Sequence, residues 1–304
     1  MFLQIYYLFI TFAGYNKFGS DNIMIIIAES GATKTDWRAL HDDGTVTSVQ
    51  TEGLNPMVLS QEEMGRVIGS AIPAVNPEGR QVKRIFFYGA GLVSPEAGAA
   101  ISSVLDLWCP FSETEFHTDM EAAGRAVFGD GEGVVAIMGT GSNSCLWQDG
   151  RIVRNIRPGG FILGDEGGGA ALGRMFLSDY VKGLVPDELA SLFDKAYGLD
   201  YAAIVKGVYR SDAPSRFVAS FAPFVCENRH NSYAADLIDR NLRDFMQRSL
   251  VRYGFGKVGV VGSFGCACRE ELERIGAEYG LEFVDFVPSP VGGLVEYHMK
   301  DLKL

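Results

Sequence analysis

The sequence predicts an α/β protein with two like halves, each built on a mixed sheet. Apolar strand-like runs alternate with helical segments along the chain, which is typical of α/β folds with mainly parallel inner strands. One local pattern also occurs twice: an apolar strand, a small-residue loop, a second strand, an Asp/Gly turn and a third strand. A chain of 304 residues is long enough for two domains, so the repeat predicts two domains of one type that face a common cleft. The short hairpins that open each half make both sheets mixed.

The two copies of this pattern each carry a small-residue loop between their first two strands. In the first copy the strands are expected at 23–28, 34–41 and 45–52, and the loop at 29–33. In the second copy the strands are expected at 133–138, 143–147 and 151–156, and the loop at 139–142. Loops of this kind bind phosphate well, because oriented backbone N–H groups and small side chains let anionic oxygens approach. The repeat therefore predicts a nucleotide-dependent phosphotransferase.

The remaining elements follow from periodicity and from capping residues. Further strands are expected at 82–88, 113–118, 257–261 and 282–287. Helices are expected at 61–71, from Pro95 to about 107, at 120–128 with Asp119 as cap, from Asp165 to about 182, at 268–279 and from Pro290 onward. The stretch 186–253 has helical periodicity throughout.

These elements divide the chain into a first domain, 23–118, and a second, 119–289, in which 186–253 is a helical insertion. The terminal helix, 290–304, is expected to pack back on the first domain. Residues 1–22 are apolar but too short for a membrane span, and they lack the basic start of a signal peptide. We expect Met24 to be the functional start and 1–22 to be an upstream leader, with a signal or anchor segment and ordered structure as the alternatives.

Charge and cysteine content exclude several classes of protein. A net charge of −11 argues against general nucleic-acid binding, which needs a basic surface. The five cysteines are an odd, scattered set, so a disulfide framework is not expected and the cytoplasm is the predicted compartment. We expect no nucleic-acid or membrane partner. A homodimer remains one option for the oligomeric state.

The first loop offers several groups to a phosphate. Glu29 opens it, Gly31 lets it turn tightly, Thr33 supplies a hydroxyl and Lys34 a positive charge. Its spacing is not that of a P-loop, and a plain hairpin turn would also explain it. The second loop, Gly139-Thr-Gly-Ser142-Asn143, is similar: its two glycines allow conformations closed to other residues, Thr140 could bind a phosphate oxygen and Asn143 a ligand hydroxyl. The pairing of the loops within one repeat favours the functional interpretation of both.

Three further segments are candidates for the site. Asp119 follows a predicted strand and precedes a predicted helix, a position at which carboxylates often line the ligand crevice of α/β folds. It is the best candidate for the base that takes a proton from an acceptor hydroxyl. The alternative is that Asp119 only caps the helix. Asp165 and Glu166 precede three glycines, which favours close approach of a ligand, although acids at a helix start also favour the helix dipole. Gly262-Ser263 follows a predicted strand, where it could bind an adenine or a ribose. The alternative is an ordinary turn between a strand and a helix.

At these loops the sequence resembles the BadF/BadG/BcrA/BcrD ATPase family, and most closely its N-acetylglucosamine kinase branch, within the actin-like sugar kinase and Hsp70 superfamily. The resemblance runs from about Met24 to the C-terminus. It depends on six segments: IAESGATKTDW (27–37), TEGLNP (51–56), TDMEAAGRA (118–126), MGTGSNS (138–144), GDEGGGAALGR (164–174) and VGSFGC (261–266). The superfamily's usual aspartate in the first loop is replaced here by Glu29.

The resemblance implies two RNase H-like (actin-like ATPase) domains around a central nucleotide cleft. It implies that Thr33 and Thr140 contact the phosphates of ATP and that Ser263 lies near the nucleoside. It also implies that a sugar is bound by Asn55, Asp119, Ser142, Asn143 and Asp165, with Asp119 as the base. Magnesium would be held by Glu29 and, through water, by Asp165.

The function predicted from the sequence is ATP- and Mg²⁺-dependent phosphorylation of an amino sugar, N-acetylglucosamine at its 6-hydroxyl. The predicted ATP-binding residues are Gly31, Thr33, Lys34, Gly139, Thr140, Gly141, Gly262 and Ser263. The alternatives are a kinase of glucosamine or a muramyl sugar, and a non-catalytic sensor of the same fold that binds sugar and ATP. The family also contains activators that hold an iron–sulfur cluster, but none of the five cysteines lies in a matching glycine-rich loop.

Overall fold

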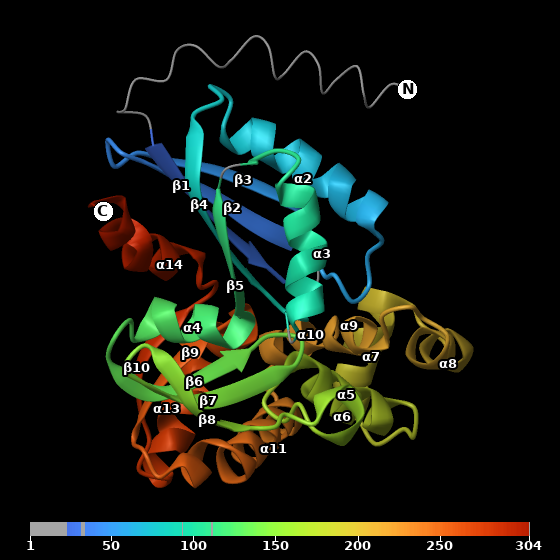
Figure 1. Cartoon of the computed structure of the whole chain (residues 1–304). Coiled ribbons are helices and arrows are strands. Elements are labelled where there is room, and N and C mark those ends of the chain that lie inside the picture. Colours follow the sequence, from blue (N-terminus) through green and yellow to red (C-terminus); the bar gives the residue numbers. More distant parts are fainter. Residues whose placement is uncertain (1–22, 32–33, 93, 111, 304) are drawn as a thin grey trace. The chain divides into compact units, whose positions relative to one another are not determined.

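A computed structural model describes residues 23–31, 34–92, 94–110 and 112–303 of the chain. The described residues form two compact units, one comprising the chain up to Ala122 together with the segment from Val291, and the other comprising Ala123–Pro290. Each unit contains one five-stranded sheet and its own helices (Figure 1). Among the described residues there is no helix with the length and apolar character needed to span a bilayer.

The sheet of the first unit has the spatial order β3-β2-β1-β4-β5. Its strands are β1 (Ile23–Ser30), β2 (Lys34–His41), β3 (Val46–Glu52), β4 (Gln81–Gly89) and β5 (Glu113–Thr118). The pairs β1–β2 and β2–β3 are antiparallel, whereas β1–β4 and β4–β5 are parallel. The sheet is therefore mixed, as predicted.

The central strand β1 is apolar throughout because both faces of this sheet are covered. Met24, Ile26 and Ala28 point into one core cluster, and Ile25 and Ile27 point into another on the opposite face. The first face is covered by α2 (Gln61–Val75) and α3 (Pro95–Leu105), which also pack on each other (Figure 1).

Both of these helices begin at a serine cap. Ser60 forms a capping box with Glu63 at the start of α2, and Ser94 caps α3, in which Pro95 is the first residue, as the sequence predicted. The caps satisfy backbone N–H groups that would otherwise have no partner at the helix start.

The opposite face of the first sheet is covered in part by the C-terminal helix α14 (Val291–His298), which contacts β1 and β2. Leu294 is fully buried against Ile25, Ile27 and neighbouring residues. His298 stacks on Phe86 and forms a 2.6 Å hydrogen bond through Nε2 with the hydroxyl of Tyr88. The short helix η2 (Met299–Lys303) follows, and its Asp301 is 2.7 Å from the other ring nitrogen of His298.

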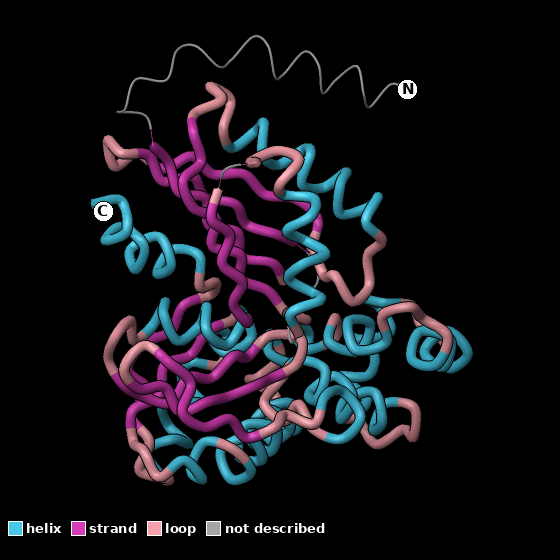
Figure 2. The backbone as a smooth tube through the Cα atoms, viewed as in Figure 1, coloured by secondary structure: helices cyan, strands magenta, loops and turns pink. Residues whose placement is uncertain are grey.

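The sheet of the second unit has the order β10-β9-β6-β7-β8, which repeats the pattern of the first (Figure 2). Its strands are β6 (Glu132–Met138), β7 (Ser142–Gln148), β8 (Arg151–Ile156), β9 (Lys257–Val261) and β10 (Glu282–Val287). Again the first three strands form antiparallel pairs and the others are parallel. The repeat of strand, loop and hairpin seen in the sequence is thus a repeat in the structure.

The helices of the second unit bury one large apolar cluster against this sheet. They are α5 (Gly160–Leu163), α6 (Gly169–Tyr180), α7 (Asp187–Tyr197), α8 (Tyr201–Tyr209), α9 (Pro214–Ala219), α10 (Ala222–Glu227), α11 (Ser232–Arg248), η1 (Leu250–Tyr253), α12 (Ser263–Ala267) and α13 (Arg269–Glu278). The helix α4 (Asp119–Val127) begins in the first unit and continues into the second. The segment 186–253 is helical, as its periodicity predicted.

The predicted α/β fold class with two mixed sheets is confirmed, but several helix boundaries are wrong. The helix predicted from Asp165 begins four residues later, at Gly169, because 165–168 form a separate turn. The helix predicted at 268–279 is present as α13, but a further short helix, α12, precedes it at 263–267, where the sequence predicted only a turn. The helix α2 continues past Ala71 to Val75 with Pro73 inside it.

Candidate functional site

In the first unit, the predicted residues gather where β1, β4 and β5 end. Glu29 lies opposite Asp36 on β2 and opposite Tyr88 on β4. The hairpin closes with a 2.9 Å hydrogen bond from Gly31 N–H to the carbonyl of Lys34. Thr33, the predicted phosphate-binding hydroxyl, lies outside the described residues.

The paired carboxylates of Glu29 and Asp36 have pKa values that are shifted in opposite directions. Burial is the main cause that raises the pKa of Glu29 to about 7, and the neighbouring carboxylate of Asp36 adds to it; Lys34 opposes the rise. Burial also acts on Asp36, but hydrogen bonds from Lys34 and Gln50 outweigh it and lower the pKa of Asp36. Lys34 Nζ is 2.9 Å from the Asp36 carboxylate, so the cation predicted for phosphate is held by an acid of its own strand.

Asp36 is a residue that sequence reasoning missed. Its side chain is only 6% exposed, and Gln50 on β3 donates to it at 3.0 Å. The available signal was a charged residue within a strand that is otherwise buried, immediately before Trp37. Buried charges need partners, so such a residue predicts a local charge network.

Asn55 is fixed beside the same hairpin by a buried hydroxyl network. The Ser30 hydroxyl donates to the Leu54 carbonyl at 2.9 Å and accepts from the Leu54 N–H at 2.8 Å. Thr35 lies 2.9 Å from Ser30 and joins the network. Asn55 follows directly, and its side-chain oxygen accepts a 2.9 Å bond from Met57 N–H. These bonds hold the segment that bears Asn55 against the end of β1.

Asp119 is the first residue of α4, and the expectation that it caps this helix is wrong. Thr118 is the cap: its hydroxyl accepts from the Glu121 N–H at 3.2 Å, while the Glu121 carboxylate accepts from the Thr118 N–H at 2.8 Å. This reciprocal pair is a capping box. The Asp119 carboxylate instead accepts from the Met120 N–H at 2.9 Å and from its own backbone N–H.

The environment of Asp119 suits a proton acceptor. Burial raises its pKa, and the bond from Met120 offsets only part of the rise. Asp119 is also among the groups whose charge raises the pKa of Glu29, which places the two carboxylates within electrostatic reach of each other. The structure thus brings Glu29, Asp36 and Asp119 together in the first unit.

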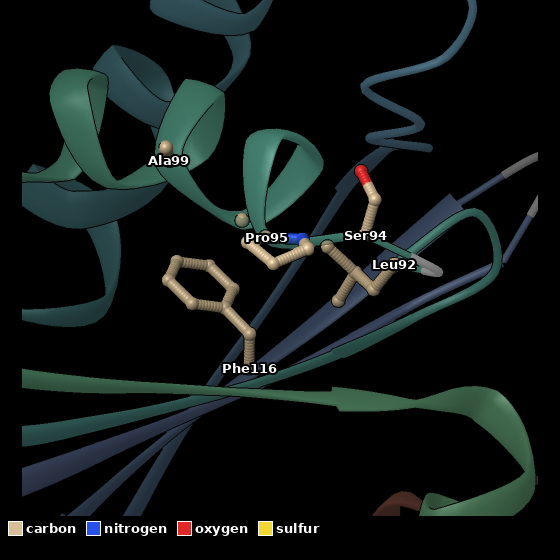
Figure 3. A pocket seen from close by; sticks show the side chains of 6 residues that line it. Leu92, Ser94, Pro95, Ala99 and Phe116 are labelled. Carbon is tan, nitrogen blue, oxygen red and sulfur yellow. The ribbon is translucent and has the colours of Figure 1, made fainter.

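The first unit also contains an open pocket of about 320 Å³ at the start of α3 (Figure 3). Phe116 of β5 and Pro95 of α3 face each other across it, with Leu92 and Ser94 at its edge. None of the predicted site residues lines this pocket.

In the second unit, the predicted loop after β6 is held by its carbonyl groups. Gly169 N–H donates to the Gly139 carbonyl and Ala170 N–H to the Thr140 carbonyl, both at 2.8 Å. Gly139 N–H donates to the Gly141 carbonyl at 3.0 Å. Since the carbonyls are bonded within the protein, the loop is fixed by its acceptors, as an anion-binding loop requires.

The structural reason for the glycines of this loop differs from the predicted one. Neither Gly139 nor Gly141 adopts a positive φ, so neither needs glycine for its backbone angles. Gly141 needs it for space: a Cβ there would lie 2.6 Å from the Asp165 carboxylate. Gly139 has no atom within 4 Å of an added Cβ among the described residues.

Asp165 lies directly on the loop. Its backbone has a φ of 57°, and its N–H donates to the Pro158 carbonyl at 3.0 Å. Burial raises its pKa, and the Ser142 backbone N–H, which donates to the carboxylate, opposes this rise. The Ser142 hydroxyl donates to the Glu166 carbonyl at 2.6 Å. The predicted residues Gly141, Ser142 and Asp165 are therefore in direct contact.

Asn143 presents its amide NH₂ group. Its side-chain oxygen accepts a 2.9 Å bond from the Ser144 backbone N–H, which fixes the orientation of the amide, and a second bond of 3.0 Å from Asn155. The nitrogen of Asn143 is thus the end available to donate to a ligand oxygen.

Gly262 places the last predicted segment beside the same loop. Its φ is 125°, and a Cβ there would lie 2.3 Å from the carbonyl of Met138, the residue before Gly139. Its N–H donates to the Val287 carbonyl at 2.8 Å, and α12 begins at Ser263. The segments at 139–143, 165–169 and 262–263 are therefore joined in one part of the second unit.

Comparison with solved structures identifies relatives of this chain. The crystal structure described as that of the "Putative N-acetylglucosamine Kinase" from Porphyromonas gingivalis is 36% identical in sequence, with a TM-score of 0.86. The match covers 91% of this chain and 99% of that one. This chain belongs to the same sugar-kinase family. The relationship confirms the predicted enzyme class, an ATP-dependent sugar kinase, but not the identity of the sugar.

More distant structures share the fold. A protein from Chromobacterium violaceum with the same description is 20% identical, with a TM-score of 0.72 and coverage of 90% of this chain and 98% of that one. A ROK-family glucokinase from Streptomyces griseus, in complex with glucose and AMPPNP, is 13% identical, with a TM-score of 0.56 and coverage of 90% and 97%. No family model and no curated protein matches the chain, so its assignment to the BadF/BadG/BcrA/BcrD branch stays a prediction.

Proposed function

We propose that this sugar kinase transfers the γ-phosphoryl group of ATP to the 6-hydroxyl of N-acetylglucosamine. The observation that carries the proposal is the state of Asp119: a partly buried carboxylate directly after β5 whose pKa is raised by burial, and which is not the cap of α4 because Thr118 has that role. The family relationship to a protein described as an N-acetylglucosamine kinase supports this sugar.

Asp119 is the proposed base. A carboxylate that orients the acceptor hydroxyl and takes its proton needs a pKa raised toward neutrality, and burial supplies that shift. Phosphoryl transfer depends mainly on positioning and on charge stabilisation, which are the roles proposed here for the two loops and for Mg²⁺.

The residues proposed to bind the nucleotide are those predicted from the sequence: Gly31, Thr33, Lys34, Gly139, Thr140, Gly141, Gly262 and Ser263. The bonded carbonyls of the loop after β6 support its role, because they hold its backbone in one conformation. Lys34 would exchange part of its ion pair with Asp36 for phosphate oxygens.

The proposed sugar contacts are Asn55, Asp119, Ser142, Asn143 and Asp165. Asn143 would donate from its NH₂ group to a sugar oxygen, since its carbonyl is already bonded. Asp165 would accept from a sugar hydroxyl, a role that suits a carboxylate held in place by Ser142 and Gly141.

Magnesium is part of the proposal, although the described residues contain no group of three or more His, Cys, Asp or Glu side chains placed to hold a metal ion by themselves. Glu29 is a partly buried carboxylate within electrostatic reach of Asp36 and Asp119, and a divalent cation would relieve the repulsion among these negative charges. Glu29 would hold the ion, with Asp165 contributing through water. When bound, Mg²⁺ neutralises charge on the phosphate oxygens of ATP. The cytoplasmic location and the homodimer considered in the sequence analysis stay predictions.

The test is ATP consumption by the purified full chain with Mg²⁺ and a panel of sugars: N-acetylglucosamine, glucosamine, glucose and N-acetylmuramate. The expected result is the highest kcat/KM with N-acetylglucosamine and formation of its 6-phosphate. A higher kcat/KM with glucosamine or the muramyl sugar would change the proposed substrate but would leave the assignment as a sugar kinase intact. Sugar binding in a calorimeter without turnover would overturn the proposal in favour of a sensor.

A further inference from the structure

The helix α11 presents one face to the turn that carries Asp165. Asn241, Phe245 and Arg248 are spaced by four and three residues, which places them on the same side of the helix. Each of them contacts a residue of the turn 165–168. This helix belongs to the segment 186–253, for which neither the sequence nor the family relationship supplied a role.

Asn241 is a buried polar residue in an apolar environment. It is 1% exposed, and the other buried residues of α11 are apolar. Its side-chain oxygen accepts from the Gly167 N–H at 2.9 Å, and its nitrogen donates to the Gly168 carbonyl at 3.2 Å. These two backbone partners fix the orientation of the amide. A buried amide of this kind is stabilising only where both ends are bonded.

Phe245 and Arg248 hold the turn on either side of this pair of bonds. Gly167 has a φ of 78°, and a Cβ there would lie 2.7 Å from the Cβ of Phe245, so the turn lies in direct contact with the helix. Arg248 lies 3.3 Å from the carboxylate of Glu166. The helix therefore contacts three consecutive residues, 166 to 168.

The other side of the turn holds the proposed ligand-binding residues. Glu166 accepts the Ser142 hydroxyl through its carbonyl at 2.6 Å, and the Gly168 N–H donates to the Asp165 carbonyl at 3.0 Å. Gly141 lies against the Asp165 carboxylate. A shift of residues 166–168 would therefore move Asp165 and the loop after β6 together.

We infer that Asn241 is a positioning residue that sets the place of Asp165 through the backbone of Gly167 and Gly168. This inference rests on the proposed function, in which Asp165 binds the sugar. It assigns a task to the helical segment: α11 is the fixed support of the turn.

The test compares Asn241→Leu with Leu242→Ala in the full chain. Leucine has the same branching and the same number of side-chain heavy atoms as asparagine, although its methyl groups are bulkier, and its side chain makes no hydrogen bonds. Leu242 is fully buried one position further along the helix, in the apolar core, so its truncation lowers stability without removing a bond to the turn. We expect Asn241→Leu to reduce kcat/KM for the sugar by about 10- to 100-fold, the range expected for misplaced binding groups. Leu242→Ala should lower the melting temperature but leave the kinetic constants unchanged.

Hydrogen exchange supplies a readout that does not need activity. The amides of Gly167, Gly168 and Gly169 should exchange faster in Asn241→Leu than in Leu242→Ala when the two are compared at equal distance below their melting temperatures. If Asn241→Leu does not fold, Asn241→Asp serves in its place, because it keeps the acceptor for Gly167 and loses the donor to Gly168.

Two results would overturn the inference. One is an Asn241 variant with the wild-type kcat/KM for the sugar; the other is wild-type exchange at residues 167–169 in that variant. Absence of sugar phosphorylation in the wild-type protein would instead refute the proposed function, and the exchange data would then decide the inference alone.

Discussion

The substitution Glu29→Gln tests the electrostatics of the first unit without requiring turnover. Glu29 is partly buried near the end of β1, opposite Asp36 and within electrostatic reach of Asp119. Burial, with help from these carboxylates, raises its pKa from an ordinary 4.5 to about 7. Glutamine has nearly the same shape but never carries the charge.

The size and sign of the effect follow from this pKa. The folded protein binds the proton of Glu29 more tightly than the unfolded chain, so the full stability is present below pH 4.5 and is lost as the pH rises toward 7. A rise from 4.5 to about 7 corresponds to about 3 kcal/mol in the free energy of unfolding. Glu29→Gln should therefore be more stable than the wild type by about 3 kcal/mol at pH 8, and by under about 1 kcal/mol at pH 5.

The assay is urea denaturation of both proteins at pH 5 and pH 8 in buffers free of divalent cations. Glu62→Gln, at an exposed position of α2, serves as the matched control for loss of a carboxylate. Added Mg²⁺ should narrow the difference at pH 8, since a bound cation stabilises the charged carboxylate. An equal difference at the two pH values, or a variant less stable than the wild type at pH 8, would refute the reasoning.

Three further predictions concern the proposed site. Asp119→Asn should reduce kcat by about 100- to 10,000-fold with little change in ATP affinity, measured by steady-state kinetics and calorimetry; near-normal turnover would remove Asp119 as the base. Gly141→Ala should lower the melting temperature because its Cβ would lie 2.6 Å from Asp165, whereas Gly139→Ala should not; equal melting temperatures would contradict the packing. Thr118→Ala should cost about 1 kcal/mol in the free energy of unfolding through loss of the cap, and an unchanged value in urea denaturation would argue against the capping box.

The repeated hairpin unit was predictable because its signals are local. The apolar runs of β1 and β6, and the turns after β2 and β7, lie within a few residues of one another in the sequence. The capping of α4 was also predictable in principle, because Thr118 and Glu121 have the spacing of a capping box. The sequence instead favours Asp119, because aspartate is a more common N-cap residue than threonine.

Other parts of the site depend on contacts between distant residues. Asn241 lies 74 residues from Gly167 in the sequence. Its spacing of four residues from both Leu237 and Phe245 places it on the apolar face of α11, but this pattern does not identify the backbone groups that it bonds. The start of α6 at Gly169 is set by bonds to Gly139 and Thr140, which lie on another loop. From the sequence alone, residues 165–168 resemble the first turn of a helix, because the bonds from Gly169 and Ala170 to the loop after β6 cannot be predicted from local signals.

The packing of α14 on the first sheet has a consequence for synthesis of the protein. Its Leu294 fills the cluster that contains Ile25 and Ile27, and its His298 bonds to Tyr88, some 210 residues earlier in the chain. A nascent chain therefore exposes this face of β1 and β4 until α14 has been synthesised, which happens only after the whole of residues 123–290. The first unit therefore starts to form before the second unit but is completed after it, and its apolar face is open to aggregation in the interval.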